Sequence, residues 1–177
     1  MADSLTYNNE VLMYSGNELT WSEPIDVVIG TQTWMIKNID IDDGQGGIYA
    51  MQVTYDGITT TQYYYTFDAA ARIANTIQGY HIPSPAEWGT LSDYVGNSTE
   101  KVRSTFGWNN TQGTNEYGFN ALPNGNYLNG AIQSKGTMAC FIRAGDEIVP
   151  TIGEDGFGAL LIPPLGTHAF SLRLIKD

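Results

Sequence analysis

Hydrophobic residues recur with helical spacing in residues 84–96, where the start of a helix is also encoded. Ser84, Pro85 and Glu87 form the S-P-x-E pattern of a capping box, in which Ser84 and Glu87 each accept from the other's backbone amide. One face of the predicted helix then carries the apolar residues Trp88, Leu91 and Val95. Gly96 is placed to end it, so the segment predicts a helix with one face against a core.

A second helix is predicted over residues 66–78. Thr66 is suited to cap its first turn, and Asp68 and Arg72 have the i, i+4 spacing of an ion pair. The face toward a core is formed by Phe67, Ala70, Ala71, Ala74 and Ile77. Residues 98–106 allow one further, shorter helix.

The remaining hydrophobic pattern is typical of strands. It covers residues 26–34, 49–55, 59–65, 160–162 and 170–175. Asp56-Gly57 lies between two of these segments and is a turn pair, so it predicts a hairpin. Residues 108–130 are instead rich in Asn and Gly, which predicts a long looped segment held by its aromatic side chains.

Residues 1–24 differ from the rest, because YNNEVL and YSGNEL form two short units with a period of seven. Either an irregular β arm or an attachment arm that pairs with another subunit explains this pattern. In the second interpretation the assembly residues are Tyr7, Leu12, Tyr14, Leu19 and Trp21. Because the segment is too short to bury these side chains alone, we expect it to be ordered against a neighbour and to drive homo-oligomer formation or docking. Residues 25–177 then form the main domain.

Composition narrows the class of protein. Of the 177 residues, 42% are hydrophobic and 12% aromatic, which is enough for one well-buried core. A net charge of −11 repels phosphate backbones and anionic membranes, so nucleic-acid binding is not expected. No apolar run is long enough to span a bilayer and no signal segment stands at Met1, so we expect no membrane insertion and synthesis in a cytoplasm.

Five segments carry a family resemblance in their order along the chain. They are IGTQTWMIKNID (29–40), YYYTFDAAARIA (63–74), YHIPSPAEW (80–88), FGWNNTQGTNEYGFNALPNG (106–125) and AFSLRLIKD (169–177). Over residues 25–177 the chain resembles the Fibrobacter succinogenes major paralogous domain, a module of surface proteins in Bacteroidetes-type bacteria and in phages that infect them. The HIPSPAEW and FSLR segments are also similar to motifs of formylglycine-generating enzymes, which share the C-type-lectin-like fold.

The resemblance implies an α+β domain of the C-type-lectin-like fold, with two main helices packed on small antiparallel sheets and long ordered loops. It places residues 170–175 beside the first strand, near residues 25–29. With no leader segment, it favours a head- or tail-fibre or decoration subunit of a phage virion, whose partners are other virion proteins and a host surface glycan or receptor. A bacterial cell-surface adhesin and an enzyme on the formylglycine-generating-enzyme-like fold are the alternatives.

Residues with catalytic chemistry are few. A formylglycine-generating activity would require two reactive cysteines, whereas Cys140 is the only cysteine and stands among apolar residues. His81 and His168 show no metal-binding spacing, and each lies in a motif with a structural explanation. We therefore expect a protein without catalytic residues and without a required cofactor.

Two groups of residues suit ligand binding. Aromatic faces and amides for a sugar are offered by Trp108, Asn109, Asn110, Asn115, Tyr117 and Asn126, although the same residues suit a structural core. Oxygen ligands for an optional calcium ion are offered by Asp40, Asp42 and Asp43, although their spacing misses the EF-hand pattern and also suits a Gly-rich turn with solvated acids.

Overall fold

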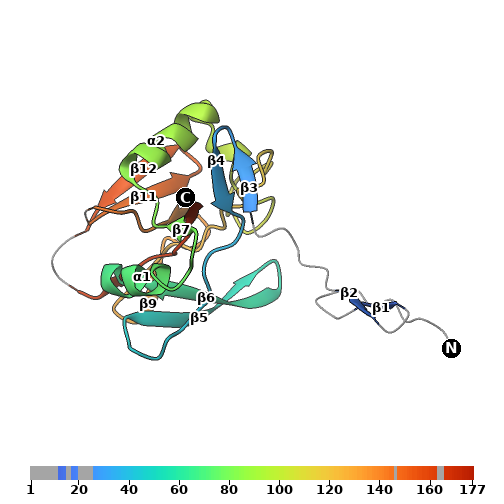
Figure 1. Ribbon diagram of the computed structural model, residues 1–177. Helices are drawn as coiled ribbons and strands as arrows, with labels where there is room; N and C mark the ends of the chain where they lie inside the picture. The colour runs from blue at the N-terminus through green and yellow to red at the C-terminus, as the bar shows by residue number, and fades with distance from the viewer. Residues whose placement is uncertain (1–11, 15–16, 20–25, 146, 163–165) are drawn as a thin grey trace.

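Two short helices and several small antiparallel sheets make this a mixed α+β protein that is mostly β (Figure 1). The computed structural model describes residues 12–14, 17–19, 26–145, 147–162 and 166–177. Its helices are α1 (Phe67–Ala74) and α2 (Pro85–Tyr94), followed by the 3-10 turn η1 (Thr99–Lys101). In these ranges no helix has the length and apolar character needed to cross a membrane.

Local capping signals place both helices. Glu87 N donates to Ser84 Oγ at 3.3 Å and Ser84 N donates to Glu87 Oε2 at 2.7 Å, so the predicted capping box is confirmed. α1 begins after Thr66 as predicted but ends earlier, at Ala74. Its buried face was predicted incorrectly in part, because Ala69 is buried while Ala71 is exposed. Alanines lie on several sides of this helix, so only tertiary packing decides which of them face the core.

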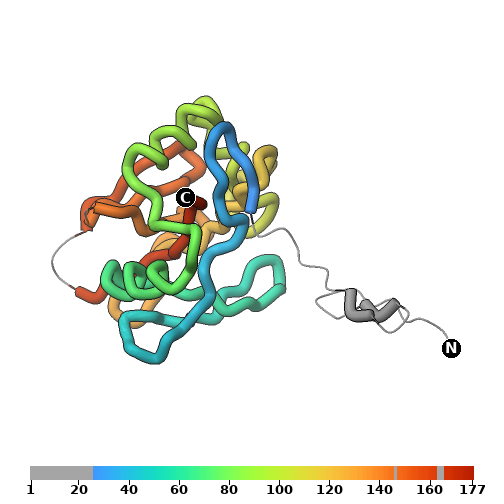
Figure 2. Tube along the Cα trace, in the orientation of Figure 1, coloured from blue at the N-terminus to red at the C-terminus, as the bar shows by residue number. Residues whose placement is uncertain are grey.

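A four-stranded antiparallel sheet joins the two ends of the domain. Its order is β3 (Asp26–Ile29), β4 (Gln32–Met35), β14 (Ile175–Lys176) and β7 (Tyr80–His81). Ile175 pairs with both Trp34 and His81, so the C-terminal strand lies inside the sheet, as Figure 2 also shows. The predicted strand 26–34 folds into the hairpin of β3 and β4, and the terminal strand pairs with its second arm at Trp34, in the same sheet as residues 26–29 but not directly beside them.

Residues 170–174 do not continue as the predicted strand. Their backbone hydrogen bonds go in turn to Tyr65, Cys140, Ile142, Ile39 and Met35. All five residues of this segment are buried. Each buried backbone polar group must form a hydrogen bond with the segment that faces it. Because several segments surround residues 170–174, their hydrogen bonds go to several neighbours and not to one paired strand.

The predicted hairpin is confirmed by β5 (Ile48–Tyr55) and β6 (Ile58–Tyr65). Its two turn residues, Asp56 and Gly57, have φ of 49° and 82°, the left-handed backbone that this turn requires. The end of β6 enters the core, where Tyr64 and Tyr65 are fully buried. The hairpin therefore has an exposed tip and a fixed base.

Two three-stranded sheets complete the domain. One contains β10 (Met138–Cys140), β11 (Ile148–Gly153) and β12 (Phe157–Leu161), and the other contains β13 (His168–Ala169), β8 (Asn126–Leu128) and β9 (Ala131–Gln133). The strand predicted at residues 160–162 is the end of β12. Residues 104–125 form a long loop between η1 and β8, and the loop predicted over residues 108–130 therefore ends too late, because residues 126–128 are β8.

A short hairpin also lies within the predicted N-terminal arm, where β1 (Leu12–Tyr14) pairs with β2 (Asn17–Leu19). The two remaining assembly residues, Tyr7 and Trp21, lie outside the described residues. The attachment role of residues 1–24 stays a prediction.

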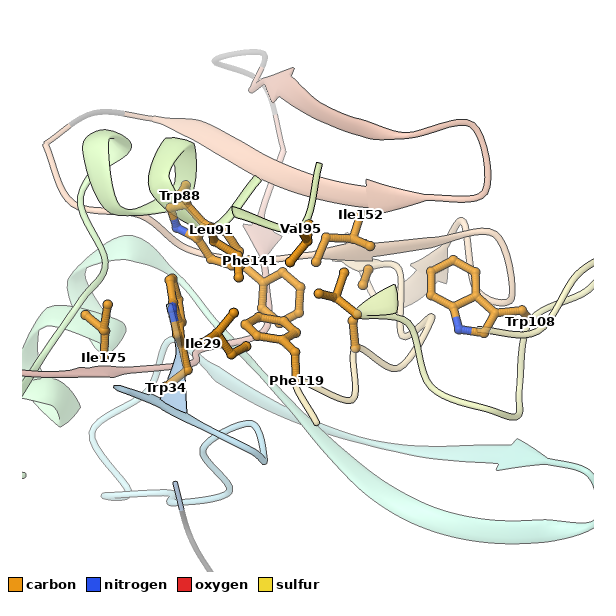
Figure 3. Packing of buried hydrophobic residues seen from close by; sticks show 13 residues of the cluster. Ile29, Trp34, Trp88, Leu91, Val95, Trp108, Phe119, Phe141, Ile152 and Ile175 are labelled. Carbon is orange, nitrogen blue, oxygen red and sulfur yellow. The ribbon is translucent and has the colours of Figure 1, made fainter. Parts of the chain in front are cut away.

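An aromatic cluster connects α2 to the sheets, as Figure 3 shows. The ring centroid of Trp88 lies 5.0 Å from that of Trp34 and 5.3 Å from that of Phe141. Phe119 closes the group from the long loop, with its centroid 5.4 Å from that of Trp34. This contact fixes the part of the loop around Phe119 to the core of the domain.

Candidate ligand-binding site

Trp108, the first of the six residues predicted to bind a sugar, is buried. Its side chain is only 3% exposed, and its indole N–H donates to Ser104 Oγ at 3.0 Å. The guanidinium carbon of Arg103 lies 4.8 Å from the ring centroid. Because this ring is buried, it offers no open face on which a sugar could stack.

The other predicted sugar ligands largely hold the long loop. Asn110 donates to Glu154 through its backbone N at 3.0 Å and its side-chain Nδ2 at 2.6 Å. Asn115 Oδ1 accepts from the backbone N of Asn120 at 2.7 Å. The remaining three are the exposed Asn109, the half-buried Tyr117 and the buried Asn126. These contacts agree with the structural interpretation of the group.

An arginine of α1 forms an ion pair with one acid of the predicted calcium loop. Arg72 Nε donates to Asp43 Oδ2 at 2.5 Å and its Nη2 donates to Asp43 Oδ1 at 3.1 Å. Hydrogen bonding to Arg72 holds the pKa of Asp43 below its usual value. Arg72 therefore binds a carboxylate 29 residues away, and the ion pair predicted with Asp68 is not the one formed.

The other two acids of this loop do not complete a metal site. Asp42 Oδ1 accepts from Gly44 N at 2.9 Å, a local turn contact, and Asp40 is exposed. Across the described ranges, no three His, Cys, Asp or Glu residues are grouped so that they could hold a metal ion.

His81 lies between two carboxylates. Its Nδ1 is 2.8 Å from Asp177 Oδ1 and its Nε2 is 2.8 Å from Glu87 Oε1. Partial burial lowers the pKa of His81, but the hydrogen bonds to Asp177 and Glu87 outweigh it and the pKa is raised overall. Ser84 Oγ donates to Glu87 as well, so both ring nitrogens face acids and neither faces a hydroxyl.

Cys140 is enclosed in the core. Its side chain belongs to the cluster around α1 and is fully buried. Burial raises the pKa of the thiol to about 12, so the nucleophilic thiolate is scarce at neutral pH.

A cavity of about 280 Å³ is formed where the long loop meets the hairpin and the C-terminal segment. It is lined by residues 36–40, residues 60–63, Asn120, Leu122 and Arg173. The first range follows β4, the second lies in β6, and Arg173 precedes β14. The fold thus brings together four segments that are distant in sequence.

Arg173 supplies a buried cation to this cavity. It is 1% exposed, and its Nε and Nη2 donate to Asn38 Oδ1 at 3.0 and 2.6 Å. Nη1 donates to the backbone carbonyl of Phe119, and the guanidinium carbon lies 4.5 Å from the Phe119 ring centroid and 5.3 Å from that of Phe141. It forms no ion pair with a carboxylate of the described residues, and burial lowers its pKa to about 9.

The polar wall of the cavity is fixed by hydrogen bonds behind it. Gln62 Oε1 accepts from Asn124 Nδ2 at 2.8 Å, and Gln62 Nε2 donates to Thr60 Oγ1 at 3.0 Å. Asn124 is itself held by the hydroxyl of Tyr55, which donates to its Oδ1 at 2.8 Å. Amide and hydroxyl groups are therefore arranged before any ligand arrives.

Of the residues that line the cavity, only Asp40 was predicted from the sequence to bind a ligand, a calcium ion, and Arg173 was not selected. Asn38 and Arg173 both lie in segments that carry the family resemblance, KNID and FSLR, but they are 135 residues apart. A charged residue inside the otherwise apolar segment AFSLRLI was the available signal for Arg173, since an arginine among core positions needs a special environment.

A comparison with protein families identifies the family of this chain. Residues 27–141, more than half of the chain, match the model of the Fibrobacter succinogenes major domain, so the chain belongs to this family. No curated protein and no solved structure matched the chain.

Proposed function

We propose that this protein is a non-catalytic structural subunit of a phage virion, a head- or tail-fibre or decoration subunit displayed on the particle surface. Its domain would adopt a C-type-lectin-like fold and bind a host surface glycan or receptor. The observation that carries the proposal is the cavity between the long loop, β6 and Arg173. Membership of the Fibrobacter succinogenes major domain family supports a surface role.

The chemistry of the cavity wall supports sugar binding. Asn38, Thr61, Gln62 and Asn120 bring amides and a hydroxyl, while Tyr63 and neighbouring aliphatic residues bring apolar surface. Sugars present hydroxyls for the first kind of group and C–H faces for the second. The wall is pre-arranged by contacts with Asn124 and Asn115, which lowers the ordering cost of binding.

The groups that an enzyme would need support the non-catalytic part of the proposal. Cys140 is buried and its pKa is raised, and the ring nitrogens of His81 are both directed at carboxylates. An acyl-transfer nucleophile needs a base within hydrogen-bond reach, and no serine of the described residues forms a hydrogen bond with His81. A catalytic role for this fold would therefore require chemistry that these residues do not offer.

A glycan array tests the binding function. We expect the protein to bind a subset of bacterial surface glycans, and Ile36→Trp, which fills the cavity, to abolish that binding. Val28→Trp is the matched control, because Val28 is 70% exposed on β3 and does not line the cavity. Equal binding by wild type and Ile36→Trp would refute the cavity as the recognition site.

Fractionation tests the location. Mass spectrometry should find the protein in purified phage particles, whereas recovery only in bacterial cell-surface fractions would support the adhesin alternative instead.

Deleting residues 1–21 should leave a folded monomer that no longer joins the particle or the homo-oligomer. Normal assembly of the truncated protein would refute the attachment role of the N-terminal segment.

A further inference from the structure

The charge of Arg173 is the least explained feature of the cavity. A buried cation is costly unless a counter-charge and hydrogen bonds compensate it. Arg173 receives only neutral partners, namely Asn38 Oδ1, the Phe119 carbonyl and two aromatic rings, and no carboxylate of the described residues pairs with it. The described residues therefore leave a positive charge beneath the cavity that no carboxylate among them neutralises.

The side chain of Asn38 links the buried guanidinium group of Arg173 to the cavity lining. A guanidinium only donates hydrogen bonds, so the contacts with Arg173 fix which end of the Asn38 amide is the oxygen. The Nδ2 group is the remaining end, and it makes no hydrogen bond to any residue in the described ranges. A half-buried amide donor polarised by a cation is suited to an anionic acceptor.

The formal charges of the residues that line the cavity also favour an anionic ligand. Lys37 and Asp40 also line it with opposite formal charges, so together with Arg173 the lining residues have a formal charge of one positive unit. The whole chain carries −11, so a positive cavity is opposite in sign to the rest of the protein. A polyanion would be repelled by that surrounding charge, whereas a small ligand with a single carboxylate would meet less repulsion.

We propose that the cavity recognises the carboxylate of an acidic sugar residue, such as a uronic acid or a sialic acid at the end of a surface glycan. The carboxylate would accept from Asn38 Nδ2 above Arg173, and the sugar hydroxyls would meet the amides and hydroxyls of Gln62, Thr61 and Asn120. A volume of about 280 Å³ lies at the small end of ligand cavities, which suits one sugar residue. This inference rests on the proposed glycan-binding function.

Calorimetry with matched sugars tests the inference. The probes are methyl glucuronide, methyl galacturonide and a methyl sialoside, compared with the neutral methyl glucoside and methyl galactoside. We expect at least one acidic sugar to bind at least tenfold more tightly than the neutral sugars. The uronides and the sialoside distinguish the two sources of the carboxylate.

Asn38→Asp is the decisive variant, because it keeps the oxygen that accepts from Arg173 but replaces the donor end with a second oxygen and neutralises the cation. We expect it to remove the preference for acidic sugars while the protein stays folded. Asn97→Asp adds the same charge at an exposed position outside the cavity and should retain the preference.

Three outcomes would overturn the inference. If neutral and acidic sugars bind equally, the carboxylate preference is wrong while the glycan-binding function stands. If Asn38→Asp keeps the preference, the acidic sugar is recognised elsewhere. If none of the sugars binds, the glycan-binding function and the inference both fail.

Discussion

The contact between Asn38 and Arg173 allows a quantitative test of the buried cation. Replacing Asn38 with Leu removes the oxygen that accepts from two guanidinium nitrogens. A hydrogen bond to a charged group contributes about 1.5–3 kcal/mol to stability, and a buried charge that loses its partner costs about 3–5 kcal/mol. Because the Phe119 carbonyl still accepts from Arg173 and the cavity can admit water, we expect a loss of about 2–3 kcal/mol.

Removing both partners should cost much less than the sum of the two losses. Arg173→Met eliminates the desolvated charge and keeps most of the volume, so Asn38→Leu in that background leaves no unpaired cation. We expect a coupling energy of about 1.5–2 kcal/mol in a double-mutant cycle measured by urea unfolding. Asn38→Asp should instead be neutral or stabilising. Additivity within about 0.5 kcal/mol would refute the claim that Arg173 depends on Asn38.

Three further predictions concern other parts of the domain. The raised pKa of His81 means that its stabilising contribution is complete below about pH 6.5 and is lost as pH rises through the raised pKa. The lowered pKa of Glu87 makes the contribution of Glu87 disappear in acid. His81→Gln should therefore flatten the pH dependence of the free energy of unfolding above about pH 6.5. Gly125→Ala should lower the free energy of unfolding by more than about 2 kcal/mol in thermal unfolding, because φ is +66° and a Cβ would lie 1.9 Å from a backbone carbonyl oxygen. The control Gly44→Ala, at φ +71° in open space, should cost about 1–2 kcal/mol. Equal losses in the two variants would contradict the clash at Gly125. Glu154→Gln should speed hydrogen exchange of the two backbone amides that donate to this carboxylate by roughly tenfold or less, since the contacts are exposed, and unchanged exchange would show that the loop is held otherwise.

Local signals in the sequence determined the helices and the hairpin. The capping box of Ser84 and Glu87 satisfies amides within three residues, so it functions whatever surrounds it. The Asp56-Gly57 turn depends on two backbone angles that favour these residue types. The stripe led by Trp88 identified the core face of α2 because its spacing follows the helical period. Each of these features depends only on residues that are close together in the sequence.

Only the tertiary structure decided the pairings between distant residues. Arg72 could bind either Asp68 on its own helix or Asp43 on a loop, and the two oxygens of Asp43 accept from both Nε and Nη2 along one edge of the guanidinium group. The C-terminal strand could lie beside β3 or β4, and in the folded chain it pairs with β4 at Trp34. Hydrophobic patterns specify which side chains are buried but not which segment covers them.

The cavity shows the same limit for function. The aromatic and amide residues of the long loop had the composition of a sugar site, yet the side chains of Trp108, Asn110 and Asn115 form contacts that hold that loop. Asn38 and Arg173 meet across 135 residues, and their contact exists because the sheet brings the C-terminal segment beside the chain that follows β4. A sequence lists the donors and acceptors, but a binding site is a set of distances between them, and those distances are fixed only when the chain is folded.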